Sequence, residues 1–458
     1  MAATWTLCAS SPTAPLVAQG RCCDPCLTRN RGEIGAVMAE RRRALPADFW
    51  RLWTASSISA VGDGVRAAAL PLLAAGLTRD PQTVALVAVA GGLPWLLLAL
   101  PAGALVDRWD RKRTMWTVDF ARAAVMGLLA AAVLTGHATI PLLLVVAFLL
   151  GSGWTLFDSA AQAALPAVVP AADLERANGR LYAANVVGGA LAGAPLGGFL
   201  FALAAAVPFG FDAASFLVAA LLALRLRADL TVTATVEGPT RLRAQIAEGL
   251  GFLWRHRELR AICILLTVWN LLENGVFAIL VLWALEVLRL PEGFYGVLLA
   301  GLAVGGVAGS LAADRVGRAL GTGRGLAIAL WGSVAAYAGL GLTSNGAVAF
   351  ALLALLGATA MLWNVLSAAF RQAVVPSRLM GRVNSAYRGA TWGVIPLGAA
   401  LGGFTADHLG LRAPFLLAAA LLVVAAIVAL PHLRSARLAA ARAEAAAAAG
   451  HPHADHPR

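Results

Sequence analysis

The chain has 458 residues, of which 60% are hydrophobic and only 13% are charged, and its mean hydropathy is +0.76. Soluble domains contain about 45–50% apolar and about 25% charged residues, so this composition predicts a polytopic membrane protein. The formal net charge is +12, but no basic recognition helix or run of stacking aromatic residues accompanies it. We therefore expect a lipid bilayer rather than nucleic acid as the partner, with arginines that set the membrane topology.

Residues 1–48 are predicted to form a polar N-terminal leader. Cys23 and Cys26 make an isolated C-x-x-C pair there, with no second pair or histidine close in sequence. We therefore expect no metal site. Met38 precedes a run of three arginines and resembles a natural start followed by a basic membrane flank. The hypothesis is that translation begins at Met38.

Long apolar runs follow the leader, each near or above the ~20 residues that cross about 30 Å of hydrocarbon. Uninterrupted runs of this length exclude the alternating pattern of a membrane barrel, so an all-α fold is predicted. The twelve predicted membrane spans are residues 50–77, 83–106, 114–135, 140–164, 178–206, 208–226, 259–288, 293–313, 324–343, 347–371, 382–408 and 411–431.

The distribution of arginine predicts the orientation of these spans. The even-numbered connections hold most of the arginines between the spans, whereas the odd-numbered ones hold only Arg79, Arg289 and Arg412. The positive-inside rule then places both termini in the cytoplasm of a cell-membrane protein. The longest internal connection divides the chain. The predicted domains are a leader at 1–48, a six-helix bundle at 49–226, a cytoplasmic linker at 227–258, a second bundle at 259–431 and a cytoplasmic tail at 432–458.

The later part of the linker, residues 242–257, has helical periodicity. Its apolar residues Ile246, Leu250 and Leu253 fall on one stripe. This pattern predicts an amphipathic helix that lies along the membrane surface.

Two halves of the chain share short motifs in one register. Gly103-Ala-Leu-Val-Asp-Arg-Trp-Asp-Arg-Lys-Arg113 follows the second span, and a weaker copy, Gly309 to Arg318, follows the eighth. Val168-Val-Pro170 likewise recurs as Val374-Val-Pro376. A common register over several features predicts that one six-helix unit is used twice.

These features resemble the major facilitator superfamily. The stretch from Phe157 to Asn178, which contains Asp158 and Gln162, resembles the end of the fourth helix in the drug:proton antiporter branch that includes macrolide-efflux and enterobactin-export proteins. Gly62-Asp63 also fits this branch. The resemblance covers residues 45–432. It implies two six-helix bundles around a central cavity, alternating access and a small-molecule cargo.

The charged turn after the second span has a physical rationale. Asp107 places a carboxylate at the helix end, and the arginines can pair with it or with terminal carbonyl groups. The resemblance implies a cytoplasmic latch between the halves, and the alternative is a topology signal alone. The gate-motif candidates are Gly103, Asp107, Arg108, Arg111, Lys112, Arg113, Asp314 and Arg315.

Charged residues inside the spans are candidates for proton coupling, because such charges are costly and usually face a partner or a cavity. Asp63 and Arg66 lie three residues apart on one helical face, and Glu273 is the second carboxylate candidate. For Asp63 a purely structural ion pair is the alternative. Asp119 and Arg122 repeat this spacing, and a structural pair is favoured there.

Further polar residues are assigned to gates, caps or a cargo cavity. We expect Asp158, Gln162 and Arg371 at the inner gate, and Asp212 as a cap at a helix N-terminus. A further set of polar and aromatic residues is assigned to a cargo cavity, and packing between membrane helices is the alternative role for these residues. The cargo-cavity candidates are Asn270, Asn274, Trp363, Asn364, Tyr387 and Arg388.

Enzymatic and ATP-binding motifs are missing from the sequence. Lys112 is the only lysine, so there is no phosphate-binding loop, and neither H-E-x-x-H nor G-x-S-x-G occurs. We expect no catalytic residue and no cofactor, with a proton gradient as the energy source. The predicted function is a monomeric, proton-coupled exporter of a small amphipathic or hydrophobic compound. An uptake permease, a non-transporting receptor and a membrane-embedded enzyme are the alternatives.

Overall fold

The computed structural model describes residues 45–106, 109–228, 239–429, 431–433 and 435–449. All the helices described below lie within the unit Pro46–Arg458. The hypotheses about Cys23, Cys26 and a start at Met38 fall outside the described residues.

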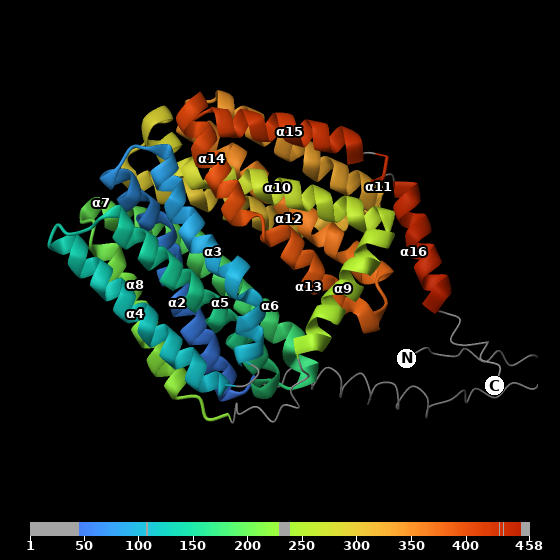
Figure 1. Ribbon diagram of the computed structural model, residues 1–458, viewed down its shortest axis with the longest axis horizontal. Coiled ribbons are helices and arrows are strands. Elements are labelled where there is room, and N and C mark those ends of the chain that lie inside the picture. Colours follow the sequence, from blue (N-terminus) through green and yellow to red (C-terminus); the bar gives the residue numbers. More distant parts are fainter. Residues whose placement is uncertain (1–44, 107–108, 229–238, 430, 434, 450–458) are drawn as a thin grey trace, which may run out of the picture. The chain divides into compact units, whose positions relative to one another are not determined.

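Every described regular element is a helix, which confirms the predicted all-α fold (Figure 1). The first half contains α2 (Ala47–Leu77), α3 (Pro81–Val106), α4 (Arg111–Leu134), α5 (Ile140–Val168), α6 (Leu174–Ala184), α7 (Ala194–Leu203) and α8 (Val207–Leu224). The second half contains α9 (Pro239–Arg255), α10 (Arg257–Leu282), α11 (Glu292–Leu342), α12 (Gly346–Val374), α13 (Met380–Trp392), α14 (Ile395–Leu409), α15 (Ala413–Ala429) and α16 (Ser435–Ala449).

Short helices of other types connect or continue these elements. The π-helices η2 (Asn185–Gly193) and η3 (Trp283–Val287) join α6 to α7 and extend α10, respectively. The 3₁₀ turns η1 (Ala171–Asp173) and η4 (Ser377–Leu379) precede α6 and α13. The two 3₁₀ turns therefore occupy corresponding places in the two halves.

Polar residues at the helix starts explain several boundaries. Asp110 accepts a hydrogen bond from the backbone N–H of Arg113 at 2.8 Å, and this side chain caps α4. Asn345 accepts bonds from the first backbone N–H groups of α12 in the same way. Because the first N–H groups of a helix lack intrahelical partners, such caps fix where the helix begins.

The predicted spans fall in these helices. Spans 293–313 and 324–343 both lie in α11, whose 51 residues are two helices that meet at a kink. Gly321 interrupts α11 with φ 79° and ψ 158°. By length and apolar composition, the described residues contain nine helices that can cross a membrane, or ten with the bent pair α13–α14 and α15. Counting α11 as two spans, and α13–α14 separately from α15, accommodates the twelve predicted spans.

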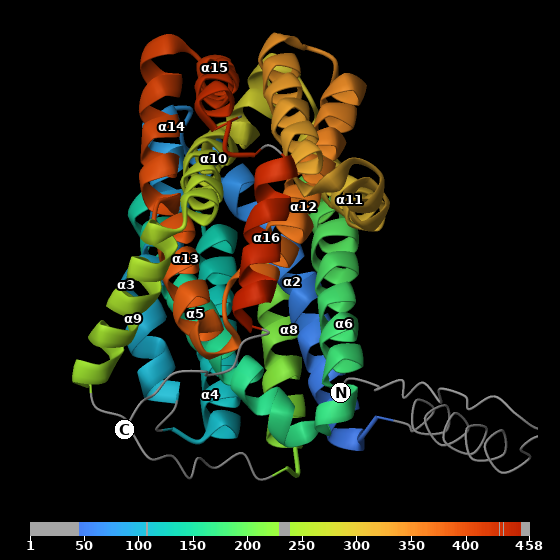
Figure 2. The same cartoon turned by 90° about the vertical axis from the view of Figure 1, so that its right-hand side faces the viewer.

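Each half packs as a bundle. In the first half α8 packs against α2 and α4, and α3 packs against α5; in the second, α11 packs against α12, and α10 against α14 (Figures 1 and 2). Small residues allow the closest approaches. A Cβ atom at Gly64 of α2 would lie 2.0 Å from the carbonyl oxygen of Gly189 in η2. A larger residue at that position would separate α2 from η2.

Helices α3 and α14, and α7 and α11, also join the two halves. Polar contacts between the two halves lie at the predicted extracellular end. Gln82 donates to Asp407 at 2.8 Å, and Arg79 lies 3.8 Å from Glu286. A Cβ atom at Gly296 would lie 1.9 Å from the carbonyl oxygen of Ala194. The halves therefore approach closely between α7 and α11, and polar contacts join them where α2 ends and α3 begins.

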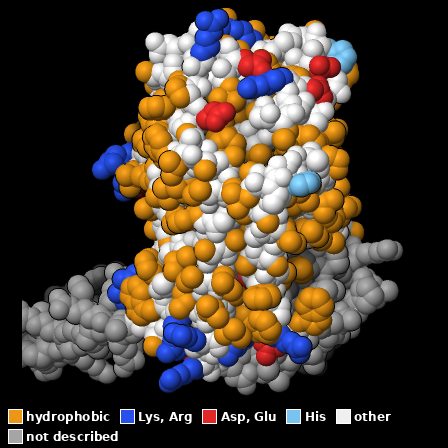
Figure 3. Space-filling model, turned by 90° about the vertical axis from the view of Figure 1, so that its left-hand side faces the viewer, with side chains coloured by type: hydrophobic (Ala, Val, Ile, Leu, Met, Phe, Trp, Pro, Cys, Tyr) orange, Lys and Arg blue, Asp and Glu red, His pale blue; other side chains and the backbone are white. Residues whose placement is uncertain are grey.

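Hydrophobic side chains cover the middle of the face shown in Figure 3, whereas most charged side chains lie toward its two ends. Large apolar side chains are exposed, such as Leu128 at 70% and Val428 at 69%. This distribution is typical of a surface that faces lipid.

The later part of the linker is helical, as predicted, and forms α9. It packs against α13, where the side chain of Arg382 forms an ion pair with Glu248. Leu253 is buried while Leu250 is exposed, so these two leucines do not share one environment. The side chain of Ile246 lies outside the described residues. α9 is therefore docked on the second bundle, and its position along the membrane surface stays a prediction.

Candidate transport site

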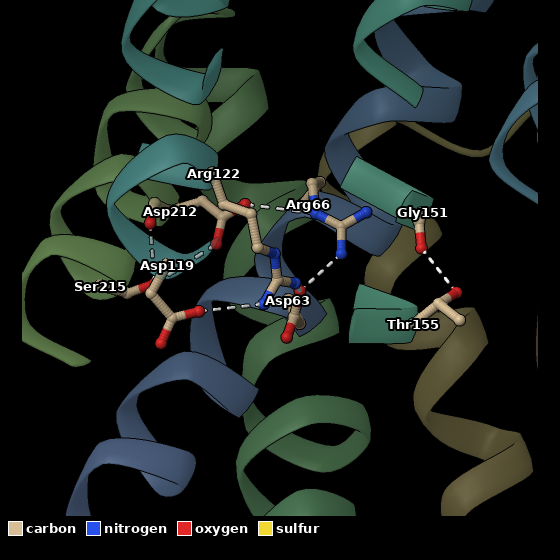
Figure 4. A network of polar contacts seen from close by, with 8 residues as sticks. All are labelled: Asp63, Arg66, Asp119, Arg122, Gly151, Thr155, Asp212 and Ser215. Atoms are coloured by element: carbon tan, nitrogen blue, oxygen red, sulfur yellow. Dashed lines mark hydrogen bonds and ion pairs between the residues drawn. The ribbon is translucent and has the colours of Figure 1, made fainter. Parts of the chain in front are cut away.

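An ionic network in the first bundle contains the first group of candidate residues. Asp63 lies on α2, and one of its carboxylate oxygens, Oδ1, accepts hydrogen bonds from two arginines (Figure 4). Arg66 on the same helix donates at 2.5 Å, and Arg122 on α4 donates at 2.9 Å. The predicted pair of Asp63 and Arg66 is present, but it is part of a larger network.

Two more carboxylates extend this network. Arg122 contacts Asp119 at 3.3 Å, and Arg66 forms an ion pair with Asp212 of α8, also at 3.3 Å. The side chains of Asp119 and Asp212 are 1% and 0% exposed. The hydroxyl of Ser215 lies 3.3 Å from Asp212. Both carboxylates therefore depend on protein groups for their polar contacts.

Asp212 corrects a sequence prediction. α8 begins at Val207, so Asp212 lies inside the helix and does not cap its N-terminus. Its side chain faces Arg66 because α8 packs directly against α2 at Gly62. A Cβ atom at Gly62 would lie 2.0 Å from the hydroxyl oxygen of Ser215. Glycine at this position is therefore required for α8 to bring Asp212 to the network.

The charges of the network do not cancel. Its members are the carboxylates of Asp63, Asp119 and Asp212 and the guanidinium groups of Arg66 and Arg122. With all five ionised, these groups have a formal charge of −1, and one bound proton makes the sum zero. Since an uncompensated charge is costly within a membrane, the network is a candidate for a functional role.

Asp63 is the network carboxylate with access to a cavity. Its side chain is 27% exposed, and with Arg122 it lines a cavity of about 380 Å³ in the first bundle. Asp158 and Gln162 line the same cavity, where Gln162 donates to Asp158 at 2.7 Å. The structure thus places two inner-gate candidates beside the proton-coupling candidate.

A larger cavity lies between residues of both bundles. Its volume is about 450 Å³, and its walls include Arg66, Trp95 and Trp154 from the first half and Phe277 and Trp392 from the second. It shares Trp154 with the cavity beside Asp63. An apolar, aromatic lining with a few polar groups is typical of small-molecule sites.

The second bundle contributes a third cavity, of about 250 Å³. Glu273 and Asn270 of α10 line it together with Trp363 and Asn364 of α12. It shares Trp392 and Ile395 with the central cavity. Glu273 forms no ion pair among the described residues, and its carboxylate faces this third cavity.

The remaining cargo-cavity candidates lie outside these linings. Asn274 donates to the carbonyl oxygen of Asn270 at 2.8 Å, one turn away on α10. Tyr387 is buried, with the guanidinium of Arg371 4.1 Å from its ring centre. Arg388 instead stacks near two tryptophans of different halves, 5.4 Å from Trp95 and 4.9 Å from Trp392.

The third inner-gate candidate, Arg371, is apart from the other two. Its Nε donates to Asn384 of α13 at 2.8 Å. Asp158 and Gln162 pair with each other on α5. The structure therefore does not bring the three residues together.

The described residues of the gate motif form hydrogen bonds with backbone carbonyl groups of the first bundle. Arg111 donates to the carbonyl oxygen of Ala163 at 3.0 Å, and Lys112 donates to that of Leu226 at 2.7 Å. The sequence predicted that the basic residues of the motif pair with Asp107 or with carbonyl groups at helix ends, and these two bonds are of the second kind. Asp107 and Arg108 lie outside the described residues, as do the surroundings of Gly103 at the end of α3.

The remaining motif residues are exposed. The side chain of Arg113 points to solvent while its backbone N–H binds the Asp110 cap. In the second half Asp314 pairs with Arg318 at 2.5 Å, and both side chains are at least 70% exposed, as is typical of a weak surface pair. Arg315 is also exposed.

The sequence did not indicate the contacts that assemble the network. Arg122 and Asp63 come from different helices, and so do Asp212 and Arg66. The sequence shows that these charged residues lie within apolar runs. It does not show how each helix is rotated about its axis, which decides the neighbour that a side chain faces. The three-residue spacings identified only the pairs within one helix.

Two helical bundles with a cavity between them, and charged side chains beside it, are typical of membrane transporters. A family model supports this class over most of the chain: the model described as transmembrane secretion effector, MFS_3, matches residues 45–455. The chain belongs to this family of the major facilitator superfamily, which confirms the resemblance seen in the sequence.

Similar proteins include transporters of mycobacteria. The multidrug efflux pump Tap of Mycobacterium tuberculosis is 30% identical over 417 residues, which cover 83% of this chain and 92% of that protein. An MFS-type transporter of the same organism is 33% identical over 173 residues, 34% of this chain, and the match spans only 38% of its length. The nucleoside transporter NupG has the same fold, with a TM-score of 0.66 at 12% identity, over 85% of this chain and 99% of that one.

Proposed function

We propose that this chain exports a small amphipathic or hydrophobic compound in exchange for protons. The observation that carries this proposal is the ionic network of three carboxylates and two arginines with Asp63 open to a cavity. Both termini are cytoplasmic in this proposal, the protein works as a monomer in the cell membrane, and alternating access takes place about the central cavity.

The charge of the network gives a reason for proton coupling. Asp63 accepts hydrogen bonds from both arginines through one oxygen, and its exposure lets it exchange a proton with the cavity. Protonation of Asp63 leaves two balanced pairs, Arg66 with Asp212 and Arg122 with Asp119. The network then has two charge states that differ by one proton, which is what coupling requires.

The connected cavities are the proposed path of the cargo. Arg66 lines the central cavity and also bonds Asp63, so a cargo in that cavity lies beside a member of the network. Glu273 faces the adjoining cavity and is the second proton-coupling candidate. The tryptophans of both cavities suit an apolar or aromatic cargo body.

Export rather than uptake is favoured by similarity to a protein named a multidrug efflux pump. An uptake permease of the same fold remains the second candidate, and flux measurements separate the two. Purified protein in proteoliposomes, with an imposed pH gradient and a panel of amphipathic compounds, reports both direction and coupling. Transport that ignores the pH gradient would contradict the proposal.

Two substitutions locate the coupling. Asp63→Asn mimics the protonated carboxyl, so we expect gradient-driven transport to be lost while exchange of labelled for unlabelled cargo continues. Glu273→Gln tests the second carboxylate in the same two assays. Glu444→Gln is the matched control, because Glu444 is an exposed carboxylate of α16 that lines none of these cavities. Full pH-driven transport by Asp63→Asn and Glu273→Gln would reject the coupling assignment.

A further inference from the structure

A groove on the outside of the second bundle lies between α10 and α15. Its volume is about 430 Å³. Four large apolar residues that line it are exposed, two of them being Ile264 of α10 and Val424 of α15. The two helices are in contact, as Figures 1 and 2 also show. The groove therefore opens outward, to the lipid side of the bundle, and not to the cargo cavities.

One end of the groove is basic. Arg257 and Arg260, at the start of α10, and His432, just after α15, belong to its lining. This is the end predicted to be cytoplasmic. Arg257 is exposed and has no partner among the described residues. Arg260 uses one N–H to bond the Trp254 carbonyl oxygen at 2.9 Å, which leaves most of its five donors available.

His432 adds a second, independent sign of an unfilled site. Its Nδ1 atom is buried and has no hydrogen-bond partner in the structure. A buried polar atom without a partner costs free energy, so a ligand oxygen at this position would stabilise it. The basic end thus presents three side chains that favour an anionic group.

The length of the groove fits a lipid chain. Its lining on α10 runs from Arg257 to Leu272, about 22 Å along a helix at 1.5 Å per residue. One leaflet contributes about 15 Å of hydrocarbon. An acyl chain can therefore lie along the groove with its headgroup beside the arginines. The cytoplasmic leaflet is also the source of anionic lipid for a basic juxtamembrane cluster.

We propose that the groove between α10 and α15 binds an anionic phospholipid, with one acyl chain against the apolar walls and the phosphate at Arg257 and Arg260. The bound headgroup would lie where α9 joins α10. Because α9 is held on α13 by Arg382 and Glu248, the lipid would fix the linker helix relative to the second bundle.

Lipid retention by the purified full chain tests this site without requiring transport. Native mass spectrometry would compare phosphatidylglycerol, phosphatidylcholine with the same acyl chains, and inorganic phosphate. We expect phosphatidylglycerol to be retained preferentially. Arg257→Gln/Arg260→Gln should weaken its binding about thirtyfold, equivalent to about 2 kcal/mol, and leave phosphatidylcholine unchanged. Arg225→Gln/Arg227→Gln is the control, because it removes equal charge from exposed positions after α8.

A second pair of variants tests the apolar part of the groove. Ala425→Trp fills the groove and should reduce lipid retention, whereas Ile427→Trp, on an exposed part of α15 outside the lining, should not. Equal retention of the two lipids would mean ordinary boundary lipid and overturn the proposal. Competition by inorganic phosphate alone would indicate a free-anion site and overturn it as well. Unchanged retention by the double arginine variant would have the same consequence.

Discussion

Arg66→Gln would test whether charge balance holds the first bundle together. It removes one of the two positive charges of the network, so the formal charge changes from −1 to −2. Each additional uncompensated charge at membrane depth costs about 2.5–3.5 kcal/mol. Since Arg66 also contacts both Asp63 and Asp212, we expect a loss of about 3 kcal/mol in stability. The melting temperature of the purified protein in detergent is the measurement.

A second substitution makes this prediction specific. Arg66→Gln/Asp212→Asn restores the charge of −1 and leaves Asp63, Arg122 and Asp119 in contact. We expect this double variant to melt at a higher temperature than Arg66→Gln alone. Arg66→Gln/Asp314→Asn has the same overall charge but alters an exposed surface pair, so it should bring no rescue. Equal rescue by Asp314→Asn, or further loss with Asp212→Asn, would refute the charge-balance reasoning.

Three other predictions concern packing, the gate motif and acidity. Gly305→Val should prevent α11 from packing on α12, because a Cβ atom there would lie 1.7 Å from a carbonyl oxygen of α12; loss of monodisperse protein on size exclusion checks this. Lys112→Ala removes the bond to the carbonyl after α8 and should cost about 1 kcal/mol in a melting experiment. The hydrogen bond from Thr83 lowers the pKa of Asp80, so its stabilising contribution is present above the unfolded pKa of about 3.9 and lost as the pH falls. The difference in melting temperature between the protein and Asp80→Asn should therefore shrink only under acid conditions.

Much of the fold was predictable because membrane helices leave strong signals. Apolar runs of about 20 residues and arginine-rich connections gave the order of the spans and the two-bundle division. The two spans within α11 were predicted as separate helices, but the sharp kink that joins them at Gly321 was not predicted. Gly321 adopts positive φ at the break, but a glycine within an apolar run has many other uses.

The candidate site was predictable in composition but not in assembly. Asp63, Arg66 and Glu273 were identified because charges inside apolar runs are rare. Asp212 was assigned to a helix end although the predicted span 208–226 already begins before it, and α8 does begin at Val207. Tertiary packing, and Gly62 in particular, decides that Asp212 reaches Arg66. A spacing rule within one helix contains no information on such contacts.

The polar contacts between the bundles have a consequence for how readily they separate. Arg79 and Glu286 are 59% and 42% exposed and lie 3.8 Å apart, so this ion pair contributes at most about 1 kcal/mol. The contact between Gln82 and Asp407 is exposed as well. Reversing a two-state population from 1:99 to 99:1 takes about 5.5 kcal/mol. These polar contacts fall far short of that free energy, so separating the bundles at this end depends mainly on parting the helix packing of α3 on α14 and of α7 on α11.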